Sequence, residues 1–258
     1  MENINIYTED DIKKVKEAGK VVAIVLGEVV NFLKEGITTY ELDKIAKETC
    51  EKLGAKCAFY GYRGFPGNIC ISINNEVIHG IPSKTRKIKE GDIVKLDFGA
   101  YLNGYYGDAA VTVGVGKISP LAKKLIDATR QSLYNAIKAA KVGNKLSDIG
   151  KAVYDYVSQF GFDVLREYAG HGIGKNLHEP PHVFNYPTSY GEKIKLQKGM
   201  ILAIEPMVTA GKPKVKTKRD NWTVVTKDGK ISAHFEHTIA ILENEALILT
   251  PWEEYING

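Results

Sequence analysis

The sequence contains few cysteines and little net charge. Only Cys50, Cys57 and Cys70 occur among its 258 residues, and none of them form a Cys-x-x-Cys pair. This usage argues against a disulfide framework and a cysteine zinc site, and it is typical of a reducing compartment. The formal net charge of +4 is too small to indicate nucleic-acid binding by itself.

Long apolar runs and targeting signals are also lacking. The N-terminal residues 1–5 show neither the basic region nor the apolar core of a signal peptide. The most apolar early segment, residues 21–33, is interrupted by Glu28 and Asn31 and is too short to cross a bilayer. We therefore expect a cytoplasmic protein that does not enter a membrane.

Two common enzyme signatures are missing. The sequence has no Gly-x-Ser-x-Gly motif, which argues against a serine hydrolase. The series Gly170-x-Gly172-x-Gly174 lacks the spacing of a dinucleotide-binding loop, so phosphate binding is not indicated. With 44% hydrophobic and 26% charged residues, the chain has the composition of an ordinary globular protein with a substantial core.

The sequence does contain a loose internal repeat. Residues 36–54 and 143–161 have the same length, begin and end with glycine, and share an apolar stripe at helical spacing. Each copy follows another predicted helix, at about residues 9–34 and 120–140, and precedes a short strand that ends in a carboxylate. The repeat predicts an α+β fold, with one domain over residues 1–258 divided into related halves, roughly 1–118 and 119–258.

Capping residues mark the ends of these predicted helices. The left-handed residues that follow the two repeated helices are expected to be Gly54 and Gly161. The N-caps expected for the four helices, in chain order, are Thr8, Thr39, Ser119 and Ser147.

Four carboxylates lie in or beside apolar, strand-like runs, where an unpaired acid is costly. They occur as two pairs related by the repeat, which makes a purely structural role for all four improbable. They are Asp97, Asp108, Glu205 and Glu236.

A hairpin turn fixes the relative position of the first two acids. Asn103-Gly104 is a strong signal for a two-residue turn. Pairing outward from this turn puts Asp97 opposite Ala110 and Asp108 opposite Gly99. The two aspartates are then diagonal neighbours, roughly 7–8 Å apart at the backbone. Carboxylates this close need a cation between them or a shared proton.

Three histidines accompany the acids. His171 and His178 lie in a glycine-rich segment that we expect to be a loop, and His79 lies in the sequence Ile-His-Gly-Ile-Pro. Oxygen ligands with one imidazole suit a pair of divalent ions such as Mn, Fe(II), Co or Zn.

Taken together, these residues resemble the dinuclear metal site of the methionine aminopeptidases, which have the pita-bread fold. Residues 168–186, with Gly-His-Gly and a second histidine seven positions after the first, are similar to the type I signature in its bacterial form. The resemblance extends from the first helix to the strand that includes Glu236. It implies two pseudo-symmetric halves and a curved antiparallel sheet covered by helices.

The resemblance also implies roles for individual residues. Two divalent ions (Co, Mn, Fe(II), Zn or Ni) would be bridged by a hydroxide that attacks the scissile carbonyl. Glu205 would accept the proton of the attacking water, His178 would bind the carbonyl oxygen, and His79 would assist protonation of the leaving amine. The implied reaction removes the initiator methionine from nascent proteins whose second residue is small. The implied metal ligands are Asp97, Asp108, His171, Glu205 and Glu236.

Family positions further imply a methionine pocket and a monovalent-cation site. Phe59 stands where some members have a cysteine, and Leu177 where phenylalanine is frequent, so the resemblance leaves the pocket shape and inhibitor preference open. Some members bind Na⁺ or K⁺ at the positions of Asn74, Glu76 and Ser232. The implied pocket residues are Phe59, Tyr62, Phe65, Cys70, His79, Leu177, His178 and Trp222.

One cluster of basic residues stands apart from these motifs. A solvated loop is the ordinary interpretation, and contact with ribosomal RNA near the nascent chain is the more specific one. We expect a monomer that acts on nascent polypeptide N-termini. The cluster comprises Lys212, Lys214, Lys216, Lys218 and Arg219.

Two other functions remain open at this level. A prolidase-like hydrolase would use the same five ligands, and a non-catalytic relative would bind nucleic acid or ribosomes. Non-catalytic members typically lose metal ligands, whereas all five are present in this sequence.

Overall fold

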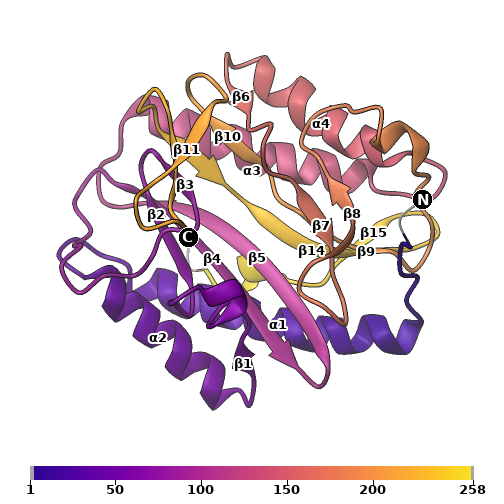
Figure 1. The fold of residues 1–258 in the computed structure, drawn as a ribbon, viewed down its shortest axis with the longest axis horizontal. Coiled ribbons are helices and arrows are strands. Elements are labelled where there is room, and N and C mark those ends of the chain that lie inside the picture. The colour runs from indigo at the N-terminus through magenta and orange to yellow at the C-terminus, as the bar shows by residue number, and fades with distance from the viewer. Residues whose placement is uncertain (1–2, 257–258) are drawn as a thin grey trace.

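The computed structural model describes residues 3–256, which form one curved sheet, two small sheets and four α-helices (Figure 1). Three short 3₁₀ helices, η1 (Tyr62–Gly64), η2 (Gly191–Lys193) and η3 (Trp252–Glu254), lie between them. The four α-helices are α1 (Glu9–Phe32), α2 (Thr39–Lys52), α3 (Pro120–Ala139) and α4 (Leu146–Ser158).

The large sheet is antiparallel and combines strands from both halves of the sequence. Its main path runs β1-β4-β5-β14-β9-β7-β8, with β2 also paired to β4 and β15 to β14. The strands are β1 (Lys56–Cys57), β2 (Cys70–Ile73), β4 (Ile93–Leu102), β5 (Tyr105–Gly114), β7 (Gly170–Gly172), β8 (Glu179–Val183), β9 (Ile201–Ile204), β14 (Glu236–Ile241) and β15 (Ala246–Ile248).

Two three-stranded sheets complete the architecture. One has the order β13-β10-β6 and the other β11-β12-β3. Their strands are β3 (Glu76–Ile78), β6 (Asp163–Val164), β10 (Met207–Thr209), β11 (Val215–Thr217), β12 (Val224–Thr226) and β13 (Ser232–His234).

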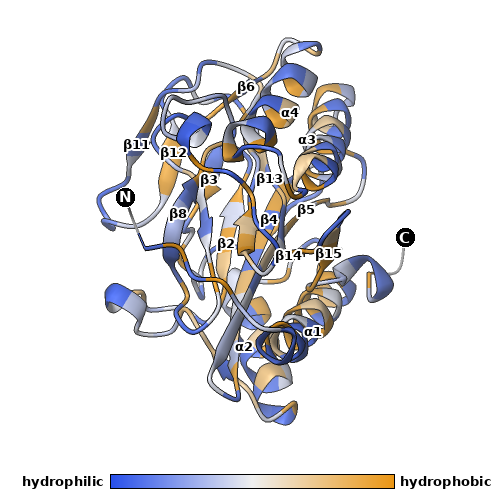
Figure 2. Ribbon diagram, turned by 90° about the vertical axis from the view of Figure 1, so that its right-hand side faces the viewer, coloured by the Kyte–Doolittle hydropathy of each residue, from blue (hydrophilic) through white to orange (hydrophobic). Residues whose placement is uncertain are grey.

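The helices lie against one side of the large sheet, and their apolar residues face it. Figure 2 shows hydrophobic residues on the central strands and on the helix surfaces that face them, with hydrophilic residues outside. The main buried cluster joins α1 residues such as Val22 and Leu26 to Leu96 of β4 and Val111 of β5. Within residues 3–256, no helix is both long and apolar enough to cross a membrane.

Most predicted helix ends are confirmed, with small shifts in the repeated helices. Thr8 forms a capping box with Asp11, and the Ser119 hydroxyl accepts a hydrogen bond from the Ala122 amide. The predicted caps Thr39 and Ser147 are wrong by one and two residues.

In α2 the N-cap is Thr38, whose side chain and that of Glu41 form a reciprocal capping box, a better arrangement than Thr39 provides. In α4 the cap is Lys145, whose amide donates to Asp148. Gly54 follows its helix directly with a positive φ, as predicted, but Gly161 lies one residue farther out because Gln159 is the C-cap.

Candidate metal centre

The β4–β5 hairpin positions the first two acids as the sequence predicts. Asp97 pairs with Ala110 and Gly99 with Asp108, so both carboxylates lie on the same face of the hairpin. Asn103, in the turn, has a positive φ of 52°, which asparagine tolerates better than most residues. The hairpin register predicted from the turn is therefore confirmed.

Strand β14 brings the third acid next to this pair. Ala110 is the neighbour of Asp97 on one side and of Glu236 on the other, so the two acids flank a single small side chain. The Thr238 hydroxyl donates to the carbonyl of Asp108 at 2.7 Å and accepts from its amide at 3.0 Å, which fixes β5 against β14. Three carboxylates thus lie on one face of three adjacent strands.

Strands β9 and β7 add a fourth acid and an imidazole. Glu205 directly follows β9, and His171 of β7 pairs with Ala203 of β9. The His171 Nε2 atom lies 3.8 Å from Glu205 Oε1. Residues 170–172, which the sequence suggested to be loop, form strand β7 because their backbone pairs with both β8 and β9.

The tautomer of His171 follows from its backbone contact. Its Nδ1 lies 2.8 Å from the carbonyl of Gly172, which can only accept a hydrogen bond. The proton of the neutral ring is therefore on Nδ1, and the Nε2 lone pair is directed toward the acids. This arrangement is typical of metal-binding histidines.

Burial makes the charged forms of these groups costly. It raises the pKa of Asp97 and of Glu205 to about 7, and it raises the pKa values of Asp108 and Glu236 well above their usual range. The neighbouring carboxylates increase the shifts of Asp108 and Glu236 further. Burial also lowers the pKa of His171, so its imidazole stays neutral.

Carboxylate oxygens that lack hydrogen-bond partners indicate whether this site is suited to metal ions. The oxygen atoms Asp97 Oδ1, Asp108 Oδ1 and Glu236 Oε1 are buried and have no hydrogen-bond partner within residues 3–256. Ligand atoms of Asp108, His171 and Glu236 lie within 4.8 Å of one another. Buried oxygens without donors, close together and beside an imidazole lone pair, fit divalent cations.

A sixth polar residue at this site, His234, is one that sequence reasoning missed. Its Nε2 lies 3.5 Å from Glu205 Oε2 and 4.0 Å from Glu236 Oε2, and these three residues form a second group of candidate ligands. Neither ring nitrogen has a hydrogen-bond partner in the described part of the chain. Its position two residues before Glu236, the spacing of one strand face, is the signal that could have identified it.

Two further histidines adjoin the acids. Burial lowers the pKa of His79 to about 4 and that of His178 to about 3, so both rings are neutral near pH 7. His178 Nδ1 lies 2.9 Å from the Tyr62 hydroxyl, and its ring centroid is 4.2 Å from that of His171. His79 has a positive φ of 58°, and its ring packs edge-on against Trp222.

A cavity of about 140 Å³ lies beside the acids and includes most of the predicted pocket. A cavity of this size accommodates benzene, which is comparable to one amino-acid side chain. Leu177 does not line the cavity but belongs to the same buried cluster as Phe59 and Phe65. Arg63, which the sequence did not indicate, does line it. The predicted residues that line it are Phe59, Tyr62, Phe65, Cys70, His79, His178 and Trp222, with all five expected metal ligands.

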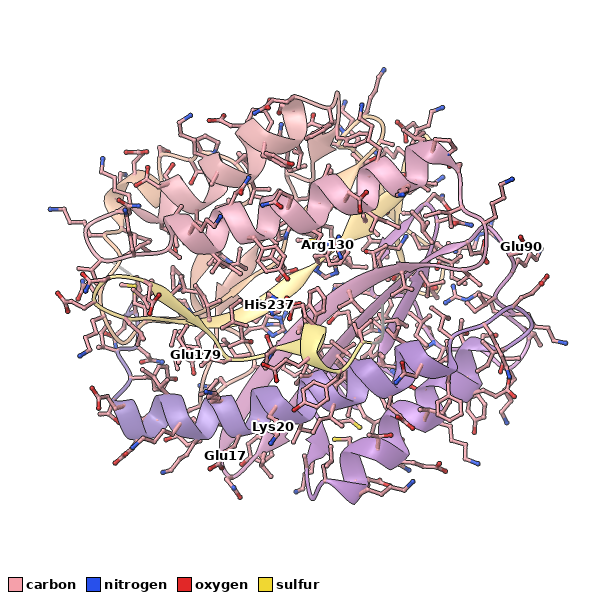
Figure 3. All side chains as sticks on the ribbon, turned by 180° about the vertical axis from the view of Figure 1, so that it is seen from behind. Glu17, Lys20, Glu90, Arg130, Glu179 and His237 are labelled. Carbon is pink, nitrogen blue, oxygen red and sulfur yellow. The ribbon has the colours of Figure 1, made fainter. Side chains whose placement is uncertain are left out.

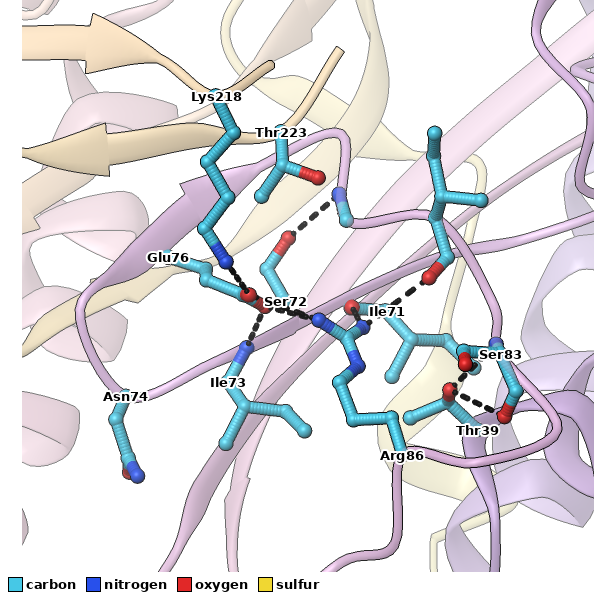
Figure 4. Close-up of polar contacts among 12 residues, drawn as sticks. Thr39, Ile71, Ser72, Ile73, Asn74, Glu76, Ser83, Arg86, Lys218 and Thr223 are labelled. Atoms are coloured by element: carbon cyan, nitrogen blue, oxygen red, sulfur yellow. Dashed lines mark hydrogen bonds and ion pairs between the residues drawn. The ribbon is translucent and has the colours of Figure 1, made fainter. Parts of the chain in front are cut away.

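The expected monovalent-cation position contains a side chain of this protein. The Lys95 ammonium group donates to the carbonyls of Asn74 and Ser232. The Glu76 carboxylate forms ion pairs with Arg86 and Lys218 (Figure 4). Burial lowers the pKa of Lys95 to about 7, and the charge of Glu76 opposes that shift.

The basic cluster forms part of strand β11 and its flanks. All five basic residues are exposed, and Lys218 alone of them forms an ion pair, with Glu76, within residues 3–256. The positive charges available to a partner are therefore four of the five that the sequence indicated.

Comparison with known proteins agrees with this geometry. The model of metallopeptidase family M24 matches residues 13–243. The chain is 51% identical to methionine aminopeptidase 1 of Bacillus subtilis, over 94% of this chain and 97% of that one. It is 49% identical to the methionine aminopeptidase of Clostridium acetobutylicum, over 96% and 98%.

Solved structures show the same relationship. The methionine aminopeptidase of Thermotoga maritima superposes with a TM-score of 0.93 and 47% identity, covering 96% of this chain and 99% of that one. The prolidase of Pyrococcus furiosus shares the fold at a TM-score of 0.76 and 22% identity, with 95% of this chain and 65% of the prolidase covered. The expected pita-bread fold is confirmed, and the chain belongs to metallopeptidase family M24, in its branch of bacterial methionine aminopeptidases.

Proposed function

We propose that this protein removes N-terminal methionine from nascent proteins whose second residue is small. The observation that supports this most directly is the cavity beside the acids, which joins a one-side-chain apolar slot to a cluster of candidate metal ligands. Phe59, Phe65 and Trp222 provide flat apolar walls, and the Cys70 sulfur provides a polarisable contact for a thioether. A slot of this size accepts one side chain, as an enzyme that removes a single residue requires.

The candidate ligands would bind two divalent ions. The residues that would hold them are Asp97, Asp108, His171, Glu205 and Glu236. Ions bound there would lower the pKa of water and polarise the scissile carbonyl. The buried site limits competing water, which strengthens electrostatic interactions with the reacting groups.

Glu205 is the candidate proton acceptor of the reaction. Its side chain is 13% exposed and that of Glu236 is 3% exposed, so Glu205 is more accessible from the cavity than Glu236. In the metal-free protein, burial raises the pKa of Glu205 to about 7. A carboxylate within reach of the attacking water could accept its proton and return it later.

His178 is positioned to stabilise the developing oxyanion. If the Tyr62 hydroxyl donates to Nδ1, the proton of the neutral ring is on Nε2, which becomes a hydrogen-bond donor toward the cavity. Because this donor is already oriented, it would strengthen its bond as negative charge develops on the carbonyl oxygen. Tyr62 is then a positioning residue for His178.

His79 would act at the other end of the scissile bond. Its neutral ring lines the cavity and is oriented by edge-on contacts with Tyr168 and Trp222. From there it would contact the amide nitrogen and assist its protonation. The rings of His79, His178 and Tyr62 all line the cavity, and rings on both sides of the scissile bond would favour a small second residue.

A peptide assay tests the proposed function. Protein treated with EDTA is restored with Co, Mn, Fe(II), Zn or Ni and given Met-Ala-Ser, Met-Leu-Ser and Xaa-Pro peptides. We expect metal-dependent release of methionine from Met-Ala-Ser, much slower release from Met-Leu-Ser, and no Xaa-Pro hydrolysis. Faster cleavage of Xaa-Pro peptides would instead identify a prolidase.

We also infer that the basic cluster contacts ribosomal RNA in the cytoplasm. Four exposed cations on one short segment favour phosphate contacts, which weaken as salt increases. Reversal of Lys214 and Lys216 to glutamate should reduce co-sedimentation with ribosomes, whereas Lys138→Glu with Lys141→Glu should not. Co-sedimentation that changes neither with salt concentration nor with the reversal of Lys214 and Lys216 would refute this contact.

A further inference from the structure

Lys95 is a lysine in the interior of the protein. It lies on β4, its residue is 1% exposed, and it is among the largest fully buried side chains. Its Nζ donates to the main-chain carbonyl of Asn74 at 2.7 Å and to that of Ser232 at 3.0 Å. Buried lysines are rare unless their charge is compensated, so the interior position of Lys95 requires an explanation.

The compensation does not come from a paired carboxylate. The nearest candidate, Glu76, accepts hydrogen bonds from Arg86, Lys218 and the Ile73 amide, as the dashed lines in Figure 4 show. No ion pair joins Lys95 to an acid anywhere in residues 3–256. The hydrogen bonds of the ammonium therefore go to neutral carbonyls, and the charge of Glu76 favours the ammonium without pairing with it.

Proteins also bind alkali-metal ions with several neutral oxygen atoms arranged around the positive charge. The Ser232 hydroxyl lies 3.1 Å from the carbonyl of Glu76 and 3.3 Å from that of Asn74, which also accepts from Lys95, so these oxygens form one cluster. An ammonium group with three donors can occupy such a cluster as a compact point charge.

The cluster connects three segments that each lead to the candidate metal centre. Lys95 is two residues before Asp97 on β4, and Ser232 is two residues before His234 on β13. Asn74 belongs to the turn before β3, which leads to His79. The Ser232 amide also donates to the Asn74 carbonyl at 3.0 Å, so the backbone of β13 is attached to this turn directly.

We propose that the Lys95 ammonium is a built-in monovalent cation, which fills the oxygen cluster of Asn74, Glu76 and Ser232 and makes the protein independent of Na⁺ and K⁺. A free ion exchanges with solvent and binds only above its dissociation constant. A lysine on β4 is present at a fixed high local concentration, so the link between β4, β13 and the turn is permanent.

Thermal unfolding in different chloride salts tests this proposal. The melting temperature is measured at one fixed pH in NaCl, KCl or choline chloride at equal ionic strength. Wild type should unfold at the same temperature in all three salts. Lys95→Ala removes the ammonium but leaves space, so Na⁺ or K⁺ should raise its melting temperature above the value in choline. A salt concentration ten times the dissociation constant gives a rise of about 3–6 °C.

Two variants serve as controls. Lys95→Met removes the charge but fills most of the space, so its melting temperature should not respond to the choice of cation. Lys117→Ala removes an exposed lysine and should behave as wild type does. An ion-independent Lys95→Ala would show that the oxygens do not form a cation site and would overturn the proposal.

Sodium-23 NMR on the wild-type protein provides a test that needs no variant to fold. We expect no protein-dependent broadening of the sodium line that KCl can reverse. Such reversible broadening, or a wild-type melting temperature higher in NaCl or KCl than in choline, would also overturn the proposal.

Discussion

His234 and His237 lie three residues apart on consecutive strands, and both are buried, but their rings have opposite surroundings. His234 faces Glu205 and Glu236, and neither of its ring nitrogens has a hydrogen-bond partner in the described structure. His237 lies on the helix-covered side of the sheet (Figure 3), where its Nδ1 is 3.0 Å from the Thr250 hydroxyl and its Nε2 is 2.9 Å from Glu253 Oε1. The two residues therefore form a matched pair for substitution by leucine.

In metal-free protein, we expect the two substitutions to change the free energy of unfolding in opposite directions, or by clearly different amounts. His234→Leu removes two buried nitrogens whose missing partners cost about 1–3 kcal/mol each, so the free energy of unfolding should stay unchanged or rise. His237→Leu removes one neutral and one charge-assisted hydrogen bond, which together contribute about 2–4 kcal/mol. For a chain of this size, His237→Leu should therefore lower the melting temperature by about 5–15 °C.

For metal affinity, we expect His234→Leu to have the larger effect and His237→Leu the smaller one. If the His234 ring contributes to the site formed by Glu205 and Glu236, its loss should weaken divalent metal binding by about 10–100-fold, as for other groups that support metal ligands. His237→Leu should leave metal affinity within about threefold of wild type, because its ring lies on the face of the sheet opposite the acids.

Urea unfolding of EDTA-treated protein and calorimetric titration with a single divalent metal would measure both quantities. Unfolding is followed by far-UV circular dichroism, because His237 stacks on Trp252 and its loss would alter fluorescence. The reasoning fails if His234→Leu destabilises the metal-free protein as much as His237→Leu does, or if both variants bind metal equally well.

Three further predictions concern the same site. His79→Ala should lower kcat by about 10²–10⁴-fold with unchanged metal content, and His182→Ala, which alters an exposed ring, should change neither; equal loss of metal and activity in His79→Ala would remove its proposed role. Gly170→Ala should destabilise the protein and release metal, because the new Cβ would lie 2.3 Å from the Ala203 carbonyl and push β7, with His171, away from β9. Gly54→Ala is its control, since that Cβ meets nothing within 4 Å and only the positive φ is unfavourable; retained metal in Gly170→Ala would count against the argument. The stability of metal-free protein should depend on the charge of Asp97. Burial raises the pKa of Asp97 to about 7, above its unfolded value of about 3.9, so the folded state binds more protons and the contribution of Asp97 falls as the pH rises between these values. Urea midpoints at several pH values should fall less steeply with rising pH in Asp97→Asn than in wild type, and parallel slopes would contradict this.

The parts of the site that were predictable are those encoded by local sequence. Asn103-Gly104 specifies a hairpin turn, and the turn determines the pairing of Asp97 with Ala110. Helix α1 begins after Thr8 because its capping box is contiguous in sequence. In these cases, neighbours along the chain provide the whole physical reason.

The parts that were missed depend on contacts between distant segments. A lysine within a strand is usually solvated, and only the approach of Asn74 and Ser232 makes the interior position of Lys95 tolerable. His234 reads as an ordinary polar residue until β13 lies beside Glu205. Leu177 occupies a family pocket position, yet it is buried in one cluster with Phe59 and Phe65 and does not line the cavity.

The β4–β5 hairpin also suggests an order for the assembly of the metal centre. Asp97 and Asp108 need only a local turn to face one another, and closing a short loop costs little entropy. His171, Glu205 and Glu236 come from the second half and can join only after long-range pairing of β14 with β5. Contacts between distant segments generally form more slowly than local ones. We therefore expect a newly made chain to present two aspartates first and to bind its metals tightly only when the halves have joined, so that metal retention reports the completion of folding.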